Sequence, residues 1–102
     1  MKLISDLVDT MMEEVHDAKH RIKKAYELKA EYPEIAKREY DIAVQELMHA
    51  DKDHASAVEL ITAYRKSNGE PPADMLAIWN EKHEKYMDKY AKVKVMIDGY
   101  NK

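Results

Sequence analysis

Residues 33–67 read PEIAKREYDIAVQELMHADKDHASAVELITAYRKS, and this stretch decides the fold. Its apolar residues recur at alternating steps of four and three, which is the period of a helix that packs along one face. We call that line of core-facing positions the seam of the helix. The stretch predicts one long helix whose seam consists of Ala36, Tyr40, Ala43, Leu47, Ala50, His54, Ala57, Ile61 and Tyr64.

Two breaks bound this helix. In Glu31-Tyr32-Pro33, the proline disfavours helical geometry at Tyr32 but suits the first turn of a new helix. In residues 67–72, SNGEPP, a glycine can end a helix in the left-handed region and the prolines prevent its continuation. The breaks predict helices over about 2–30, 33–67 and 72–99.

The same period holds in the two flanking helices. The first has the seam Ile4, Val8, Met11, Val15, Ala18, Ile22 and Ala25. The last has the seam Leu76, Trp79, His83, Tyr86, Tyr90, Val93 and Ile97. In the middle helix, every second seam residue from Ala36 to Ala57 is alanine, at intervals of seven residues, which lets a neighbour approach closely. We therefore expect the middle helix to be the central one.

Composition favours one all-α domain over residues 1–102. The chain is 45% apolar and 36% charged, with two glycines and no phenylalanine, which is typical of long helices. Short connections predict an antiparallel up-down-up bundle. Three such long helices cover each other incompletely, so we expect a dimer that uses apolar positions off the seams. These positions are Leu3, Leu7, Met12, Val44, Met48, Leu60 and Ile78.

Charge and cysteine content narrow the function classes. The net charge of -3 is spread along the chain, and acidic residues lie among the lysines, so a nucleic-acid partner is not favoured. The absence of cysteine excludes disulfides and thiolate metal sites. We see no signal peptide and no apolar run of about 20 residues, so we expect no membrane partner and a cytoplasmic location.

Four polar residues are predicted to meet in the core. Folding the helices back about the two breaks brings Glu14 level with Asp51, and His54 level with His83. By helical spacing, the two histidines point into their seams, and Glu14 and Asp51 lie at seam edges. The sequence thus predicts one polar layer that draws on all three helices.

This layer has two interpretations. Carboxylate oxygens and neutral imidazole nitrogens bind iron, manganese or zinc, and Asp51 and His54 lie three residues apart, so they can reach one ion. Alternatively, His54 bonds to Asp51 or Glu14, and His83 bonds to a tyrosine hydroxyl or to Asn80, in a network that fixes helix register.

Residues 50–55, ADKDHA, resemble the Glu-x-x-His-Ala helix of ferritin-like proteins, especially rubrerythrins and the short encapsulated ferritins, with Asp51 in place of glutamate. Glu14 matches the carboxylate of the preceding helix. The resemblance implies a carboxylate-bridged di-iron centre that oxidises ferrous iron or reduces peroxide. In the encapsulated type, short chains dimerise to complete the site.

Two departures from that pattern weaken the assignment. Asp51 is one methylene shorter than glutamate, and the last helix offers Asn80-x-x-His83 where a complete chain would carry a second Glu-x-x-His. Two functions therefore remain. One is a ferritin-like metal-binding protein that binds or oxidises iron, with ligands Glu14, Asp51, His54 and His83. The other is a non-catalytic module for interaction or assembly, in which these residues are structural and the partner is another protein.

Three further acid-x-x-His pairs occur in the chain. They are Glu13 with His16, Asp17 with His20, and Glu46 with His49. Helical spacing turns all three away from the seams, so we expect solvated faces with local ion pairs. We find no phosphate-binding loop and no nucleophile beside a base, which leaves hydrolase and nucleotide-binding functions without support.

Overall fold

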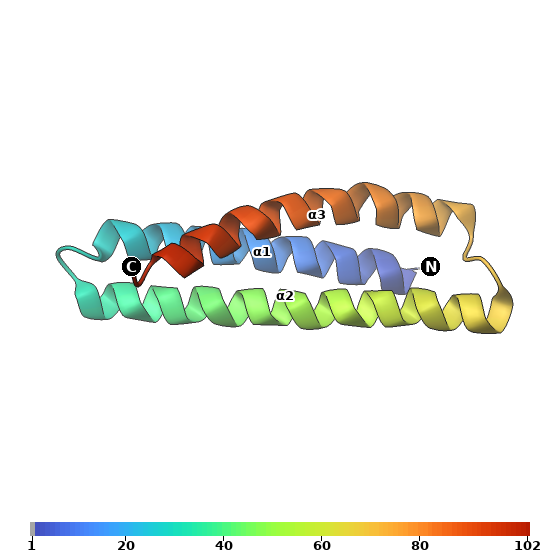
Figure 1. The fold of residues 1–102 in the computed structure, drawn as a ribbon, viewed down its shortest axis with the longest axis horizontal. Coiled ribbons are helices and arrows are strands. Elements are labelled where there is room, and N and C mark those ends of the chain that lie inside the picture. The colour runs from blue at the N-terminus through green and yellow to red at the C-terminus, as the bar shows by residue number, and fades with distance from the viewer. Residues whose placement is uncertain (1) are drawn as a thin grey trace.

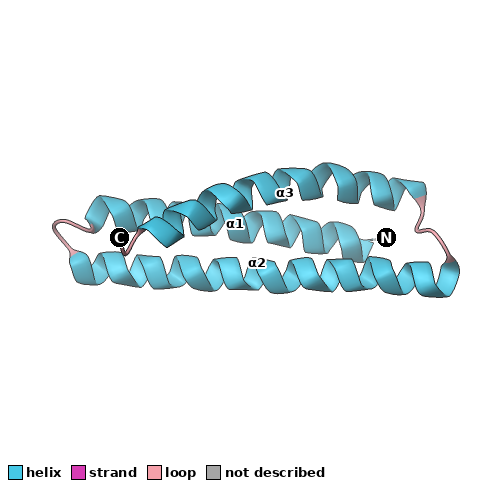
Figure 2. Ribbon diagram, in the orientation of Figure 1, coloured by secondary structure: helices cyan, strands magenta, loops and turns pink. Residues whose placement is uncertain are grey.

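The computed structural model describes residues 2–102, apart from the side chains of Lys2, Leu3 and Asn68. The chain forms α1 (Lys2–Leu28), α2 (Pro33–Asn68) and α3 (Ala73–Gly99), as Figures 1 and 2 show. Residues 2–102 contain no strand, which confirms the all-helical prediction. The predicted interface role of Leu3 lies outside the described side chains.

Proline and glycine determine the ends of the helices. Tyr32 has φ −132° and ψ 67°, outside helical geometry, and its N–H donates to the carbonyl of Leu28 at 2.7 Å. The first helix therefore ends at Leu28 rather than at Ala30. Gly69 has φ 86°, and its N–H donates to the carbonyl of Arg65 at 3.2 Å, which closes α2. The long helix α2 is continuous through the residues of the predicted polar layer.

The molecule is an elongated rod of 56 × 22 × 18 Å. The turn between α1 and α2 lies at one end and the turn between α2 and α3 at the other, so the C-terminus returns to the first turn (Figure 1). None of the helices described over residues 2–102 carries an apolar stretch long enough to span a membrane.

The first helix, α1, is the central one, and the expectation that α2 would be central is wrong. Close backbone packing joins α1 to α2 and α1 to α3, whereas α2 and α3 approach each other at few positions. The alanines of α2 explain the closeness of α1, because Ala43 and Ala50 are fully buried and have no long side chain to hold α1 away. Aromatic rings fill the wider space between α2 and α3, among them Tyr86 and Tyr90.

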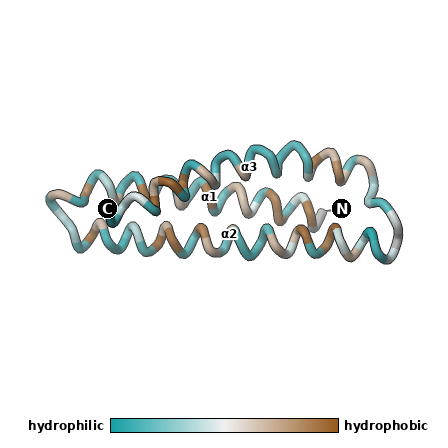
Figure 3. Tube along the Cα trace, in the orientation of Figure 1, coloured by the Kyte–Doolittle hydropathy of each residue, from teal (hydrophilic) through white to brown (hydrophobic). Residues whose placement is uncertain are grey.

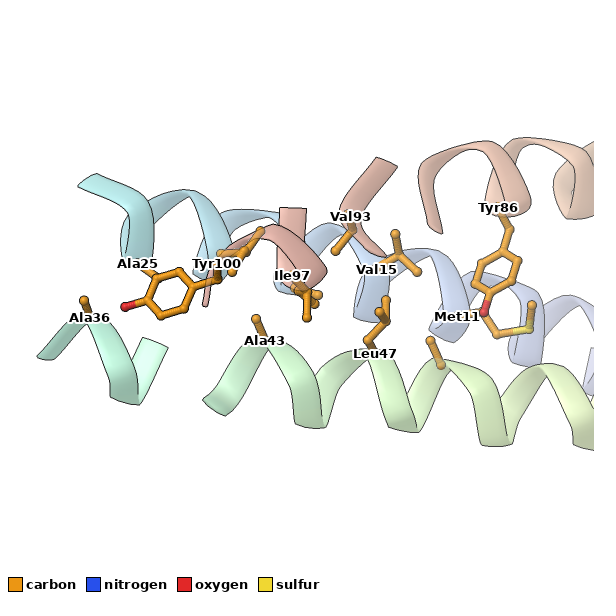
Figure 4. Packing of buried hydrophobic residues seen from close by; sticks show 13 residues of the cluster. Met11, Val15, Ala25, Ala36, Ala43, Leu47, Tyr86, Val93, Ile97 and Tyr100 are labelled. Carbon is orange, nitrogen blue, oxygen red and sulfur yellow. The ribbon is translucent and has the colours of Figure 1, made fainter. Parts of the chain in front are cut away.

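Apolar residues recur along all three helices (Figure 3), and most of the predicted seams are buried. All seven seam residues of α1 are at most 3% exposed. Tyr86 reaches from α3 toward Met11, and Val15 and Leu47 lie farther along the same core (Figure 4). At the start of α3, the buried residue is Met75, whereas the predicted Leu76 is partly exposed.

The apolar core has two parts. One extends from Tyr100 and Ala36 at one end of the rod to Met11, and the other contains Ile4, Val8, Ala57, Ile61 and Met75. Along the α2 seam, Ala50 belongs to the first part and Ala57 to the second, and His54 lies between them. The structure thus places polar side chains at the level that the sequence predicts.

Candidate metal centre

Glu14 is a largely buried carboxylate at the contact of α1 with α2. Its side chain is 14% exposed, and its Oε1 atom is inaccessible to solvent. Among the side chains that the structure describes, this Oε1 is the one buried polar atom without a hydrogen-bond partner. A buried carboxylate oxygen without a partner lowers the stability of the fold. A proton or a cation bound at this position would remove that penalty.

Glu46 and His49 of α2 face Glu14. Nδ1 of His49 lies 3.9 Å from Oε2 of Glu14, and one ligand atom from each of the three residues lies within 4.8 Å of the others. Glu46 is partly buried and His49 is exposed, so solvent reaches this cluster from one side. We call Glu14, Glu46 and His49 the carboxylate–histidine cluster.

Negative charge accumulates around Glu14. Burial is the main reason that its pKa is raised from 4.5 to about 8, followed by Asp53, whose carboxylate can accept a hydrogen bond from Glu14 only when Glu14 is protonated, and by repulsion from Asp53, Glu46 and Asp17. A carboxyl group with such a pKa holds a proton at neutral pH unless a cation takes the place of that proton. The same surroundings that favour the proton therefore also favour a metal ion.

The donor set fits a divalent transition metal. Two carboxylates and one imidazole match the mixed oxygen and nitrogen preference of iron, manganese and zinc, and the chain has no thiolate to select a softer ion. Glu46 and His49 lie three residues apart on α2, so both ligands leave the same face of the helix. Metal at this position would satisfy Oε1 of Glu14 and offset the carboxylate repulsion.

The two predicted seam histidines meet each other. Nε2 of His54 lies 2.8 Å from Nε2 of His83, and both residues are partly buried. The ring of Trp79 stacks on His83 with centroids 4.5 Å apart, and the ring of Tyr86 stacks on His54 at 5.6 Å. Burial, followed by repulsion from His54, lowers the pKa of His83. This arrangement links α2 to α3 through an imidazole–imidazole hydrogen bond and aromatic stacking.

Asp51 lies elsewhere, on the exposed side of the contact between α2 and α3. Its Oδ2 accepts a hydrogen bond of 2.9 Å from the hydroxyl of Tyr90. Burial, followed by this hydrogen bond and the charge of Asp51, raises the pKa of Tyr90 to about 12. The four predicted ligands thus fall into three groups, because Glu14 faces Glu46 and His49, His54 faces His83, and Asp51 faces Tyr90.

Glu46 and His49 are expected on a solvated face, but the structure places both beside Glu14, with Glu46 partly buried and His49 exposed. In α2, residues 46, 49 and 53 lie along one edge of the seam, whereas Val44, Met48 and Asp51 lie along the other edge and line a hollow with Tyr90 of α3. Since Glu14 pairs with the first edge, its partners there are Glu46 and His49. The sequence could have identified Glu46 and His49 as the neighbours of Glu14 if the edge of the seam on which each residue lies had been considered together with its level along the rod.

Comparison of the chain with known protein families, with characterised proteins and with solved structures gives no match.

Proposed function

We propose that this protein binds a divalent transition-metal ion, with iron, manganese or zinc as the candidates, through Glu14, Glu46 and His49. The observation that carries the proposal is the buried, unpartnered Oε1 of Glu14, which faces a second carboxylate and an imidazole within 4.8 Å. A purely structural carboxylate at this depth would be expected to have a cationic or hydrogen-bonding partner on each oxygen.

The ligand set supports a ferritin-like metal-binding function more closely than the motif at Asp51 does. Di-iron proteins of that type use one glutamate from each of two helices and one Glu-x-x-His from each of two others. This chain supplies half of that set, namely Glu14 from α1 and Glu46-x-x-His49 from α2, with glutamate rather than the shorter aspartate. A bound ion would supply Lewis acidity and, for iron, redox chemistry, and the three side chains would hold it.

A second copy of the chain would supply the other half, and we include the homodimer in this proposal. The face that carries the cluster also carries apolar side chains on either side of it. Ile42 is 38% exposed and Ile35 is 47% exposed, and Leu7, Leu28 and Leu60 are partly exposed on the flanks. In α2, Ile35, Ile42, Glu46 and His49 lie at steps of seven, four and three, along one helical face. Two antiparallel three-helix units that meet along this face would form a larger helical bundle around shared ligands.

The test compares two matched double variants. Tag-free protein is loaded anaerobically with ferrous iron, desalted and measured for iron, manganese and zinc. Glu46→Gln with His49→Gln should abolish stoichiometric metal. Asp51→Asn with His54→Gln also alters one carboxylate and one imidazole, five residues farther along α2, and should retain the metal. Loss of metal only in the second variant would contradict the proposed site and would indicate that Asp51 and His54 are the ligands.

The molecular mass of the metal-loaded protein tests whether two copies of the chain share the metal ligands. Light scattering after size-exclusion chromatography should give the mass of a dimer in the metal-loaded state, and Ile42→Glu should give a monomer with weakened metal binding. A metal-loaded monomer that binds the ion as tightly as the wild type would contradict the proposal that two copies share the ligands.

A second candidate function rests on different contacts. The hydrogen bonds between His54 and His83 and from Tyr90 to Asp51 tie α2 to α3 in the way expected of a network that fixes helix register. In that case, the protein is a helical module for assembly with another protein and does not require metal. Wild-type protein that retains no metal after anaerobic loading, and whose melting temperature does not respond to metal, would favour this function.

A further inference from the structure

The first helix carries a pair of histidines outside the carboxylate–histidine cluster. Nε2 of His16 lies 3.1 Å from Nε2 of His20, one helical turn away, and the two ring planes make an angle of 81°. Both side chains are exposed, and α1 is helical without interruption from Lys2 to Leu28. The backbone therefore holds the two imidazoles at a fixed spacing on the surface.

A hydrogen bond between the two rings is a weak reason for the two Nε2 atoms to lie so close together. At an exposed position, water can satisfy both nitrogens equally well, so an imidazole–imidazole bond adds little stability. Holding two side chains in one geometry also costs rotamer freedom. Two Nε2 atoms this close together, on histidines four residues apart on a helix, are also spaced as in helical zinc sites that use two histidines.

The distance fits one metal ion. Two nitrogens that are 3.1 Å apart, each about 2.0 to 2.1 Å from a single ion, subtend an angle of roughly 95 to 100° at that ion. This angle lies between the ~90° of square-planar or octahedral geometry and the ~109° of tetrahedral geometry. The two histidines could therefore bind a single ion without a change in the backbone of α1.

The donor atoms and the surrounding charge indicate which ion. Two imidazole nitrogens favour zinc, nickel and copper(II) over the harder magnesium and calcium. His16 lies in a surface hollow together with Glu13, Asp17 and Lys89 of α3. His20 lies in a neighbouring hollow in which acidic and basic side chains balance each other, lined by Asp17, Arg21, Lys23, Lys24, Glu27 and Glu46. The remaining coordination positions open to solvent and would be filled by water.

We infer that His16 and His20 form a second, surface-exposed metal site that binds zinc, nickel or copper(II) through two imidazole nitrogens. It is independent of the proposed function, because it shares no ligand with Glu14, Glu46 and His49. Binding there also links two successive turns of α1. Metal should therefore raise the melting temperature of the protein even when the carboxylate–histidine cluster is disabled.

The test uses the background Glu46→Gln with His49→Gln, so that a failure of the proposed function cannot affect the result. Tag-free protein is titrated with nickel by calorimetry at pH 7.5. In the matched control, His20→Lys is combined with Lys24→His, which keeps composition and charge but separates the two histidines by two turns, about 12 Å. Circular dichroism should show equal helicity in the two proteins.

We expect the protein with the intact pair to bind one nickel ion at least tenfold more tightly than the control, and zinc should compete for the same site. His20→Gln alone should weaken binding to the same extent, which provides a second variant with a smaller change in sequence. Equal nickel affinity in the intact protein and in the control would overturn the inference.

Discussion

Nε2 of His54 lies 2.8 Å from Nε2 of His83, although 29 positions separate the two residues in the chain. At this distance, one imidazole donates its N–H to the lone pair of the other, which requires at least one neutral ring. Since α2 and α3 otherwise approach each other at few positions, this contact is a principal link between them. Its protonation state should therefore affect the stability of the protein.

Acid should weaken the fold through His83. The pKa of His83 is below its ordinary value of 6.5 in the folded protein, so the unfolded chain takes up this proton first as the pH falls. The free energy of unfolding should decrease as the pH drops below about 6.5. His83→Gln should reduce this dependence in urea denaturation at pH 7.5 and 5.5. The exposed His16→Gln is the control, and an unchanged pH dependence in His83→Gln would refute the prediction.

Alkali should weaken the metal-free fold through Glu14. Its pKa in the folded protein, about 8, lies above its ordinary value of 4.5, so the folded state holds the proton more tightly. The contribution of this proton to the free energy of unfolding is fully present below pH 4.5, and it should be lost as the pH rises through about 8. Glu14→Gln removes the charge and should raise the free energy of unfolding at pH 8.5 by roughly 1–3 kcal/mol. The exposed neighbour Glu13→Gln should leave it nearly unchanged.

Metal and proton should compete at the same carboxylate. If the carboxylate–histidine cluster binds metal, the affinity should rise between pH 6 and 8, because the ion must displace the proton of Glu14, and the release of this proton to the buffer becomes easier as the pH rises. Zinc titrations at several pH values, with proton release measured in buffers of different ionisation enthalpy, would show this coupling. A pH-independent affinity over that range would argue against Glu14 as a ligand.

The close approach of α1 and α2 should depend on alanine at Ala50. This side chain is fully buried, so Ala50→Leu must force the helices apart or adopt a strained rotamer. We expect a loss of roughly 1–3 kcal/mol in the free energy of unfolding, measured by urea denaturation. The exposed Ala55→Leu adds the same atoms on the same helix and should change stability by less than about 0.5 kcal/mol. Equal effects would indicate that α1 does not constrain this position.

Gly99 should be coupled to Tyr26 across the contact of α1 with α3. A Cβ atom at Gly99 would lie 3.1 Å from the hydroxyl oxygen of Tyr26, which donates a 2.6 Å hydrogen bond to the carbonyl of Met96. Gly99→Ala should displace that hydroxyl, so its cost should be smaller in the Tyr26→Phe background. A double-mutant cycle of unfolding free energies should give a coupling of about 0.5–1.5 kcal/mol. Additive effects would show that the hydroxyl moves freely.

The helices and their buried faces could be read from the sequence. The four-and-three period of α1 predicted seven seam residues, from Ile4 to Ala25, and all of them are buried. The proline at 33 and the glycine at 69 predicted both turns, because each restricts or permits backbone angles by its own covalent structure. These are local properties, so no tertiary information was needed.

The partners of the polar residues could be read only in part. Helical level predicted correctly that His54 would meet His83, since both lie on seams. Helical level does not separate Asp51 from Glu46 and His49 as neighbours of Glu14, because all three lie near the same level of α2. The choice depends on which edge of the α2 seam faces Glu14 and which is covered by α3.

The sequence by itself determined three amphipathic helices, the turns between them and the level at which polar side chains interrupt the core. The tertiary structure decided that α1 is the central helix and that α3 packs where Asp51 pairs with Tyr90. It thereby left Glu14, Glu46 and His49 together on the other edge. The physical reason is that periodicity specifies which face of a helix is buried, whereas the packing of side chains of different size decides which neighbour covers each edge of that face.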